Sequence, residues 1–372
     1  MGDDGRETLN IGVIGVGLIG KRHVKKYAEV AGANVVAVAD INETEAQSVA
    51  REFAVPHFYK DFRELLARPD IDAVDVCLHN NLHMPVTIAA MEAGKDVLCE
   101  KPIAGSYRDG LAMVETARKL GRRLAVQLNG GVFARETRAA KELIDAGMLG
   151  EIYHARSTGY RRRGRPFVDG YATPAFVQKQ TSAGGALIDM GIYHLAQVLY
   201  LMGNPTPRRI TGKAYQKTAM DEARRAASGY DVEELGVGFV HFDGDVTLDV
   251  IEAWAIHMDA FEGSSIAGTK GGIRLKPFKY LHTAGDMLMT SEVNLDEAQR
   301  RWSSVRGDEA YYRTSQDHWV AANLGKVELL PTAEVALNAM LITEGIYRSG
   351  ELGREVTAKE VMERSASTAV GV

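Results

Sequence analysis

The chain has little cysteine and no long apolar run. Cys77 and Cys99 are the only cysteines in 372 residues, and both lie in apolar, strand-like stretches. This excludes a disulfide-stabilised secreted scaffold and favours a reducing compartment. No apolar run approaches the roughly 20 residues that a membrane-spanning helix needs, and the acidic, polar residues 1–6 are not typical of a signal peptide. We therefore expect a cytoplasmic protein with no membrane partner.

A large excess of charge of either sign is also absent. The sequence has 44 basic and 49 acidic side chains, a formal net charge of −5, which gives no reason to expect a nucleic-acid partner. Its apolar and charged fractions, 45% and 25%, are those of an ordinary globular protein. A chain of this length is expected to form two domains, and we expect no bound metal ion.

The first strand and the glycines after it match a dinucleotide-binding fingerprint. Leu9–Ile14 is apolar, Gly-Val-Gly-Leu-Ile-Gly follows directly at residues 15–20, and residues 21–30 have helical character. In this setting Gly15 permits a tight turn, Gly17 lets the backbone approach a pyrophosphate, and Gly20 lets the helix pack closely on the strand. The N-terminus of the helix then faces the phosphates.

The end of the second predicted strand indicates which dinucleotide is bound. Residues 34–39 are apolar and end in Asp40, about 20 residues beyond the last glycine, as the fingerprint requires. A carboxylate there accepts hydrogen bonds from a ribose diol and repels a 2′-phosphate, and Ile41 and Asn42 supply no compensating cation. We therefore predict NAD as the cofactor, with NADP disfavoured.

The order of helical and strand-like stretches predicts two domains of different construction. Helices are expected at residues 44–53, 62–67, 85–93 (Pro85 in the first turn) and 107–120, alternating with strands at 73–78, 97–99 and 124–128. Such alternation predicts a parallel, doubly wound sheet. Beyond it we expect helices at 135–146, from about 185, and at 332–349 (stopped by Gly350), strands at 152–157, 209–214, 235–242, 247–256 and 265–268, and loops or hairpins at 218–234 and 290–315. We thus predict an α/β Rossmann domain over residues 1–128 and an α+β domain with a large, mostly antiparallel open sheet over residues 129–372.

The sequence Glu-Lys-Pro at residues 100–102 ends a predicted strand abruptly. Ligands of an open α/β sheet bind outside the carboxyl ends of its strands, so we expect Lys101 to lie where a bound cofactor meets its substrate. Pro102 disfavours helix at the residue before it and makes a stiff corner. Taken alone, the same pattern also fits an exposed surface lysine.

A second polar cluster follows two glycines at positions 184 and 185. Asp189 and Tyr193 are four residues apart in a predicted helix and so share one side of it, whereas His194 is turned roughly 140° from Asp189. Carbinol oxidation needs a group that takes the hydroxyl proton, and an ammonium such as Lys101 nearby is expected to lower the pKa of Tyr193. A regular helix favours Tyr193 as the base. Gly191 would permit a distorted helix, however, so His194 stays an alternative. The alternative is structural: Asp189 caps or forms a salt bridge, and Tyr193 packs.

Together these motifs resemble the Gfo/Idh/MocA oxidoreductases, the family named for glucose–fructose oxidoreductase and inositol dehydrogenase. The resemblance rests on residues 15–23, 100–102 and 184–191 and spans nearly the whole chain. It implies a Rossmann domain followed by an α+β domain whose open sheet packs against another subunit, which gives a homodimer or homotetramer. It also implies NAD(P)-linked chemistry on sugars, cyclitols or related polyols, with Lys101 as the motif lysine and Asp189 as the substrate-side aspartate.

The chain departs from the family pattern at two places. Many members carry histidine where this chain has Tyr193, with His194 beside it, whereas members similar to glucose–fructose oxidoreductase carry tyrosine there. The identity of the base therefore stays open. The other departure is His-Asn-Asn at residues 79–81, where members often have Thr-Pro-Asn, although Asn81 and His83 remain aligned.

A basic run at residues 160–165 follows a predicted strand of the second domain. It is either a solvated or interface cluster, or a site where guanidinium groups bind a carboxylated or phosphorylated sugar. Lys179 is a further candidate at the substrate mouth.

The predicted site residues form three groups. The catalytic residues are Lys101, Asp189, Tyr193 and His194. The cofactor-binding residues are Gly15, Gly17, Leu18, Ile19, Gly20, Asp40, Leu78, Asn81, His83, Glu100, Lys101 and Asn129. The substrate-binding residues are Lys101, Tyr160, Arg163, Lys179, Asp189 and Tyr193.

These residues predict an NAD-dependent dehydrogenase that oxidises or reduces a ring carbinol of a sugar, sugar derivative or cyclitol by hydride transfer. Lys101 would hold the hydroxyl oxygen, Tyr193 or His194 would relay the proton, and Asp189 would orient the substrate. Two alternatives stay open. One is a redox-assisted, NAD-dependent lyase or glycosidase that uses the same residues, and the other is a non-catalytic, cofactor-binding regulatory protein of the same fold.

Overall fold

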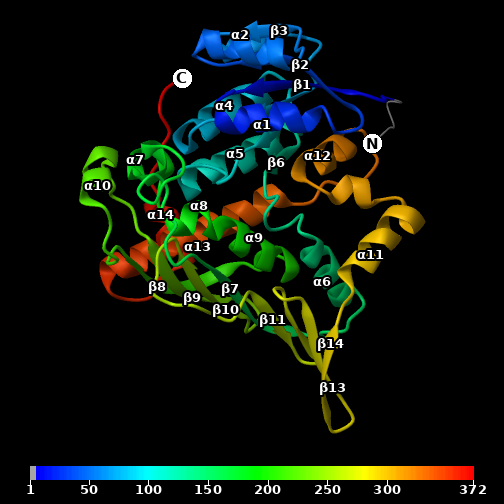
Figure 1. Cartoon of the computed structure of the whole chain (residues 1–372), viewed down its shortest axis with the longest axis vertical. Helices are drawn as coiled ribbons and strands as arrows, with labels where there is room; N and C mark the ends of the chain where they lie inside the picture. The colour runs from blue at the N-terminus through cyan, green and yellow to red at the C-terminus, as the bar shows by residue number, and fades with distance from the viewer. Residues whose placement is uncertain (1–5) are drawn as a thin grey trace.

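The computed structural model describes residues 6–372, which form two sheets with helices between and around them (Figure 1). The prediction made for residues 1–6 lies, apart from Arg6, outside the described residues. Between residues 6 and 372, no helix is both long and apolar enough to cross a membrane.

The first sheet is a six-stranded, all-parallel Rossmann sheet in the order β3-β2-β1-β4-β5-β6. Its strands are β1 (Leu9–Ile14), β2 (Ala33–Ala39), β3 (His57–Tyr59), β4 (Ala73–Val76), β5 (Asp96–Cys99) and β6 (Leu124–Val126). The helices between them are α1 (Leu18–Tyr27), α2 (Glu43–Glu52), α3 (Phe62–Leu66), α4 (Asn80–Glu92) and α5 (Tyr107–Leu120). The predicted doubly wound domain is confirmed, and β3 is a short strand that the sequence did not indicate.

Two of these helices begin earlier than predicted. Helix α1 starts directly after Gly17 rather than at residue 21. Helix α4 starts at Asn80, so Pro85 lies inside the helix and not in its first turn, where we had placed it. A proline inside a helix leaves the carbonyl four residues earlier without its usual partner. Here that carbonyl belongs to Asn81, and it accepts a hydrogen bond from the N–H of Val370.

The second sheet has nine strands in the order β14-β13-β12-β11-β7-β10-β9-β8-β15. The strands are β7 (Ile152–Tyr160), β8 (Pro207–Tyr215), β9 (Leu235–Phe242), β10 (Thr247–Ala253), β11 (Ser265–Gly268), β12 (Gly271–Arg274), β13 (Lys279–Ala284), β14 (Met287–Glu292) and β15 (Val356–Thr357). Across the described residues, neighbouring strands of this sheet are antiparallel except β7 and β10, which are parallel. The mostly antiparallel sheet is confirmed, and β12 to β15 extend it beyond the predicted strands.

The helices of the second half include several that the sequence did not indicate. They are α6 (Arg135–Asp145), α7 (Lys179–Ser182), α8 (Ala186–Asp189), α9 (Gly191–Leu201), α10 (Glu222–Ser228), α11 (Leu295–Arg301), α12 (Ser315–Asn323), α13 (Thr332–Leu352) and α14 (Ala358–Arg364), with single turns at Pro174–Val177, Trp302–Arg306 and Glu309–Tyr312. Helices α10 and α11 lie in the stretches predicted as loops, and the side chains of Asp221 and Asn294 cap them. Helix α13 passes through Gly350 and ends before Gly353, whose φ of +67° is the left-handed conformation that glycine tolerates.

Helices from the end of the chain join the two sheets. Helix α13 packs against β8 and β9 of the second sheet and against α5 and β6 of the first (Figure 1). On α12, Trp319 is fully buried in a cluster that includes Val13 and Tyr27 of the Rossmann half. The domain boundary at residue 128 therefore remains a prediction. In the folded protein the C-terminal helices pack against both sheets.

Candidate active site

Lys101, Asp189 and Tyr193 meet in the structure. The ammonium nitrogen of Lys101 donates to Asp189 Oδ1 at 2.8 Å and to the Asp189 carbonyl at 3.1 Å, and it lies 5.2 Å from the centre of the Tyr193 ring. Lys101 comes from the corner after β5, and its backbone N–H donates to the carboxylate of Glu100 at 2.8 Å. The structure thus unites three of the predicted catalytic residues from two distant stretches of the chain.

The helix that carries Asp189 and Tyr193 is broken between them. Helix α8 ends at Asp189 and α9 begins at Gly191, with Met190 at the junction. A Cβ on Gly191 would lie 2.9 Å from the side chain of Glu252, so glycine permits this close packing. Both side chains still face Lys101, because the junction residue keeps near-helical dihedral angles.

The charges in this cluster determine its protonation. Burial tends to raise the pKa of Asp189, but the Lys101 ammonium lowers it below its usual value, and the pKa of Lys101 is raised in turn. The indole of Trp254 donates to the other Asp189 oxygen at 3.3 Å. Lysine and aspartate therefore form an ion pair at neutral pH.

The pKa of Tyr193 shifts in the direction opposite to the one that we predicted. Burial raises the pKa of Tyr193, and the charge of Lys101 opposes this without overcoming it. The ammonium lies over the face of the ring, so it stabilises the phenolate less than a direct contact with the oxygen would. Without its ligands the protein therefore keeps Tyr193 protonated.

His194 pairs with a carboxylate of the second sheet. Its Nδ1 lies 2.9 Å from the carboxylate of Glu252, which is fully buried and also accepts a hydrogen bond from Ser157. A Cβ on Gly159 would lie 2.1 Å from the imidazole, so a glycine of β7 makes room for it. Burial alone would lower the pKa of His194, but Glu252 raises it. Glu252 was not predicted from the sequence, where its signal is an acidic residue at an inward-facing position of an alternating strand.

The glycine turn has the shape that a pyrophosphate requires. Gly15 has a φ of +86°, and a Cβ there would lie 2.4 Å from the carbonyl of Cys77. A Cβ on Gly20 would lie 1.9 Å from the carbonyl of Gly15. No described atom lies within 4 Å of a Cβ built on Gly17, so the backbone is open at that point. In the first turn of α1, Leu18 is exposed and Ile19 half-buried.

Asp40 lies beside this turn. One oxygen of its carboxylate accepts the N–H of Val16 at 2.9 Å, and the other accepts the N–H of Asn42 at 2.9 Å. Each carboxylate oxygen has a second lone pair, which is available for a ribose hydroxyl. The turn and the carboxylate therefore fit NAD.

The other predicted cofactor residues lie close by but mainly bond to the protein. His83 is fully buried and joins the carbonyls of Pro102 and Leu78 at 2.8 and 3.0 Å, and burial lowers its pKa. The side chain of Leu78 packs beside the glycine turn, 2.7 Å from a Cβ built on Gly15. His83 thus ties the loop after β4 to the Lys101 corner.

Asn129 and Asn81 are similarly engaged. The amide of Asn129 donates to Gln316 at 3.2 Å and accepts the N–H of Ser315, both on α12. The Asn81 carbonyl accepts the N–H of Val370. These contacts hold the rim of the candidate cofactor site against the C-terminal part of the chain.

The structure does not bring Tyr160, Arg163 or Lys179 to Lys101. The hydroxyl of Tyr160 donates to the carbonyl of Asp259. The side chain of Arg163 is 69% exposed and lies 3.6 Å from Asp169, and Lys179 is exposed on α7. Their assignment to substrate binding remains a prediction without a contact to support it.

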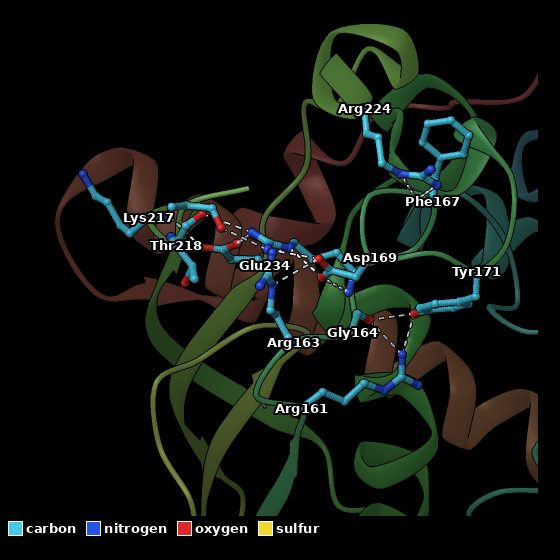
Figure 2. A network of polar contacts seen from close by, with 12 residues as sticks. Arg161, Arg163, Gly164, Phe167, Asp169, Tyr171, Lys217, Thr218, Arg224 and Glu234 are labelled. Atoms are coloured by element: carbon cyan, nitrogen blue, oxygen red, sulfur yellow. Dashed lines mark hydrogen bonds and ion pairs between the residues drawn. The ribbon is translucent and has the colours of Figure 1, made fainter. Parts of the chain in front are cut away.

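Within the basic run, Arg161 and Arg165 have opposite environments, and Figure 2 shows Arg161 beside Tyr171. Arg165 is fully buried and bonds to the carboxylates of Asp169 and Glu234, at 2.9 and 3.0 Å. Arg161 is exposed, lies over the ring of Tyr171 and donates to its hydroxyl. Arg165 is therefore part of the structure, whereas Arg161 is exposed at the surface, as are Arg162 and Arg163.

Arg161 also lies on the Asp189 side of the second sheet. The backbone N–H of Arg161 donates to the carbonyl of Ala253. The next residue, Trp254, donates its indole N–H to Asp189. The charge of Arg161 contributes to the lowered pKa of Asp189. Sequence analysis named the run but could not separate this arginine from its neighbours.

Comparisons with known proteins agree with this site. Residues 9–128 match the model of the oxidoreductase family with an NAD-binding Rossmann fold, and residues 137–274 match the GFO/IDH/MocA C-terminal domain. The chain is 29% identical over 357 residues to D-glucoside 3-dehydrogenase of Escherichia coli K12, covering 94% of this chain and 97% of that protein. It is 39% identical over 146 residues to inositol 2-dehydrogenase of Pseudomonas savastanoi, covering 39% of this chain and 44% of that one.

A solved structure gives the same fold. An NAD-binding oxidoreductase from Klebsiella pneumoniae superposes with a TM-score of 0.77 at 22% identity, covering 94% of this chain and 99% of that one. The two family models match successive parts of the chain, one on each sheet, in the order that the fold requires. This chain therefore belongs to the Gfo/Idh/MocA family and is an NAD(P)-dependent oxidoreductase.

Proposed function

We propose that the protein is an NAD-dependent dehydrogenase that transfers hydride to or from a ring carbinol of a sugar, sugar derivative or cyclitol. The observation that carries this proposal is the Lys101–Asp189 ion pair beside Tyr193, at the strand end next to the open glycine turn. The relatives named for glucoside and inositol dehydrogenation support the substrate class.

Each residue has one role in this proposal. NAD, when bound on the glycine turn, supplies the hydride acceptor. Lys101 holds the substrate hydroxyl oxygen and stabilises negative charge on it. Tyr193 carries the proton, and because burial raises its pKa, the charge of Lys101 must offset part of that cost. Asp189 fixes Lys101 and orients the substrate.

The preference for NAD over NADP rests on Asp40. Its carboxylate lies beside the glycine turn, bonded to the N–H of Val16, and its charge would repel a 2′-phosphate. Ile41, the next residue, is exposed and carries no charge. Titration of both cofactors, followed by intrinsic fluorescence, tests the preference. Equal or tighter binding of NADP would refute it.

We also propose that the protein is a homodimer or homotetramer located in the cytoplasm. Helices α8 and α13 pack on one face of the second sheet, where glycines of β9 meet Leu187 and Ile346. The opposite face carries Val237, Phe239 and Ile251, which remain half-buried in the single chain. A second copy would cover this apolar face. Sedimentation that returns only the 40.5 kDa monomer at micromolar concentration would count against it.

A substrate screen tests the proposed activity. Purified protein is mixed with NAD and a panel of glucosides, free sugars and inositols, and formation of NADH is followed by absorbance. We expect turnover of at least one ring carbinol substrate, and the Lys101→Met variant is the matched control for background reduction. A lyase of the same fold would consume substrate without accumulating NADH, and a regulatory protein would bind NAD without any turnover.

A further inference from the structure

A buried histidine near the candidate active site has a carboxylate oxygen within ion-pair distance of each ring nitrogen. His23 of α1 is 4% exposed. Its Nδ1 lies 2.8 Å from Asp75 Oδ2, and its Nε2 lies 3.0 Å from Glu100 Oε1. A neutral imidazole has one N–H only, whereas an imidazolium has two. Because each nitrogen faces a carboxylate oxygen, the contacts are those of the charged form.

The groups around His23 favour that charged form. Tyr27 of α1 donates its hydroxyl to Asp75 at 2.7 Å, and the thiol of Cys77 donates to the same carboxylate at 3.4 Å. Burial raises the pKa of the Cys77 thiol, which therefore stays protonated. Burial alone would lower the pKa of His23, but the carboxylate of Asp75, which lies against Nδ1, opposes this and raises it. Among the described residues, the titratable groups against the imidazole are Asp75, Cys77 and Glu100, and Tyr27 acts on it through Asp75.

His23 also limits what Glu100 can bind. Oε1 of Glu100 meets His23 and the amide of Gln127 at 3.1 Å, and Oε2 accepts the backbone N–H of Lys101 at 2.8 Å. Two hydrogen bonds and one ion pair thus engage the Glu100 carboxylate. The side chain of Lys101 follows Glu100 directly in sequence, yet its ammonium is bonded to Asp189.

We propose that His23 is a positioning residue whose positive charge neutralises Glu100, so that the Lys101 ammonium stays on Asp189 and the substrate hydroxyl. The proposal rests on the proposed dehydrogenase function, since it assigns Lys101 to the hydroxyl. It adds a residue of the cofactor-binding helix to the machinery of proton transfer. Asp75 supports His23, and Tyr27 and Cys77 in turn support Asp75.

The electrostatics give this proposal a direction. The charge of Glu100 raises the pKa of both Lys101 and Tyr193, while the charge of His23 lowers that of Tyr193. Replacing His23 by a neutral residue leaves Glu100 uncompensated, so the pKa of Tyr193 rises further. The rate of carbinol oxidation should then need a higher pH, and the acidic limb of the pH profile of kcat/KM should move upward by about one unit.

The kinetic test uses His23→Gln, Glu100→Gln and the double variant, with Arg22→Gln, an exposed neighbour on the same helix, as the control. We expect His23→Gln to lower kcat about 10- to 100-fold, to shift the acidic limb upward, and to leave the affinity for NAD unchanged. The double variant should return the limb toward its parental position, because both charges are gone. The proposal would be overturned if the acidic limb of the pH profile did not move in His23→Gln and kcat fell further in the double variant. That result would show that His23 has a structural role only.

A second measurement does not depend on turnover. The ring nitrogens of His23, observed by ¹⁵N NMR in the protein without ligands, should both stay protonated well above pH 6.5 and should titrate lower in Glu100→Gln. A neutral His23 at pH 7 would overturn the proposal even if sugars are oxidised. If instead no carbinol is oxidised by the parental protein while His23 titrates as expected, the proposed function fails and the His23–Glu100 pair stands.

Discussion

The two halves of the candidate site are held together by different kinds of contact. At the glycine turn, backbone atoms approach one another so closely that Gly15 and Gly20 have no room for a side chain, and Asp40 bonds to backbone N–H groups. Around Lys101, buried charged side chains pair instead. These pairs are Lys101 with Asp189, His23 with Glu100, and His194 with Glu252. The cofactor half thus depends on backbone shape, and the catalytic half depends on charge.

The difference predicts that changes of charge and changes of shape damage different functions. A buried charge that loses its partner costs several kcal/mol or changes its protonation state, so the catalytic half should respond to pH and to isosteric neutral substitutions. In the cofactor half, the glycine turn has no titrating group and should respond to added volume, while Asp40 should respond to the loss of its charge. Each variant below tests one side of this division.

Lys101→Met should have the largest effect. The variant removes the cation that holds the substrate oxygen, and loss of one such electrostatic group costs on the order of 10²- to 10³-fold in kcat. Steady-state NADH formation measures it. Turnover near the parental rate would make Lys101 structural and favour the regulatory alternative.

Tyr193→Phe should come next, with a loss of about 100-fold in the chemical step, the lower end for a positioned proton carrier because Lys101 remains. His194→Gln should act mainly on KM, since His194 bonds to Glu252, whereas Lys101 bonds to Asp189. Parallel kinetics of the two variants decide between the two candidate bases. An active Tyr193→Phe together with an inactive His194→Gln would transfer the role to His194.

Asp40→Ala should have a smaller effect, confined to the cofactor. Loss of hydrogen bonds to a charged group costs about 1.5–3 kcal/mol, so the affinity for NAD should fall about 10-fold or more while that for NADP falls less or rises. Fluorescence titration of both cofactors measures the ratio. An unchanged ratio would mean that the carboxylate does not meet the ribose.

The smallest effect of the series is expected for His194→Gln. It concerns the thermal stability of the protein, and it should depend on pH. The folded protein raises the pKa of His194, so its pairing with Glu252 stabilises fully below the unfolded value of about 6.5 and is lost as pH rises through the folded value. The variant should therefore lower Tm more at pH 6 than at pH 9. The same loss of Tm at both pH values would contradict this.

The cofactor half was predictable because its signals are local. The strand, the three glycines and Asp40 lie within residues 9–40, and the resulting turn depends on few contacts from elsewhere. The position of Lys101 at the end of a strand was likewise predicted from the local sequence Glu-Lys-Pro. The short helices α10 and α11 were missed although Asp221 and Asn294 are ordinary capping residues, because their polar surroundings lack an apolar stripe.

The catalytic half was predictable only in part, because its contacts join residues that are far apart in the sequence. Glu252 pairs with His194 across 58 residues, and Glu234 buries Arg165 across 69. Nothing in the local sequence distinguishes Arg165 from Arg161 or Arg163, although one is fully buried and the others are exposed. Only the folded sheet decides which arginine meets a carboxylate.

The most direct test of this division is an NAD titration of two variants, Gly17→Ala and Lys101→Met, each compared with the parental protein by intrinsic fluorescence. A Cβ on Gly17 meets no described atom within 4 Å, so Gly17→Ala should fold normally but occupy space needed by the pyrophosphate. We predict weakened NAD binding for Gly17→Ala and parental binding for Lys101→Met. Parental affinity in Gly17→Ala, or equal weakening in both variants, would contradict the separation of a cofactor half from a catalytic half.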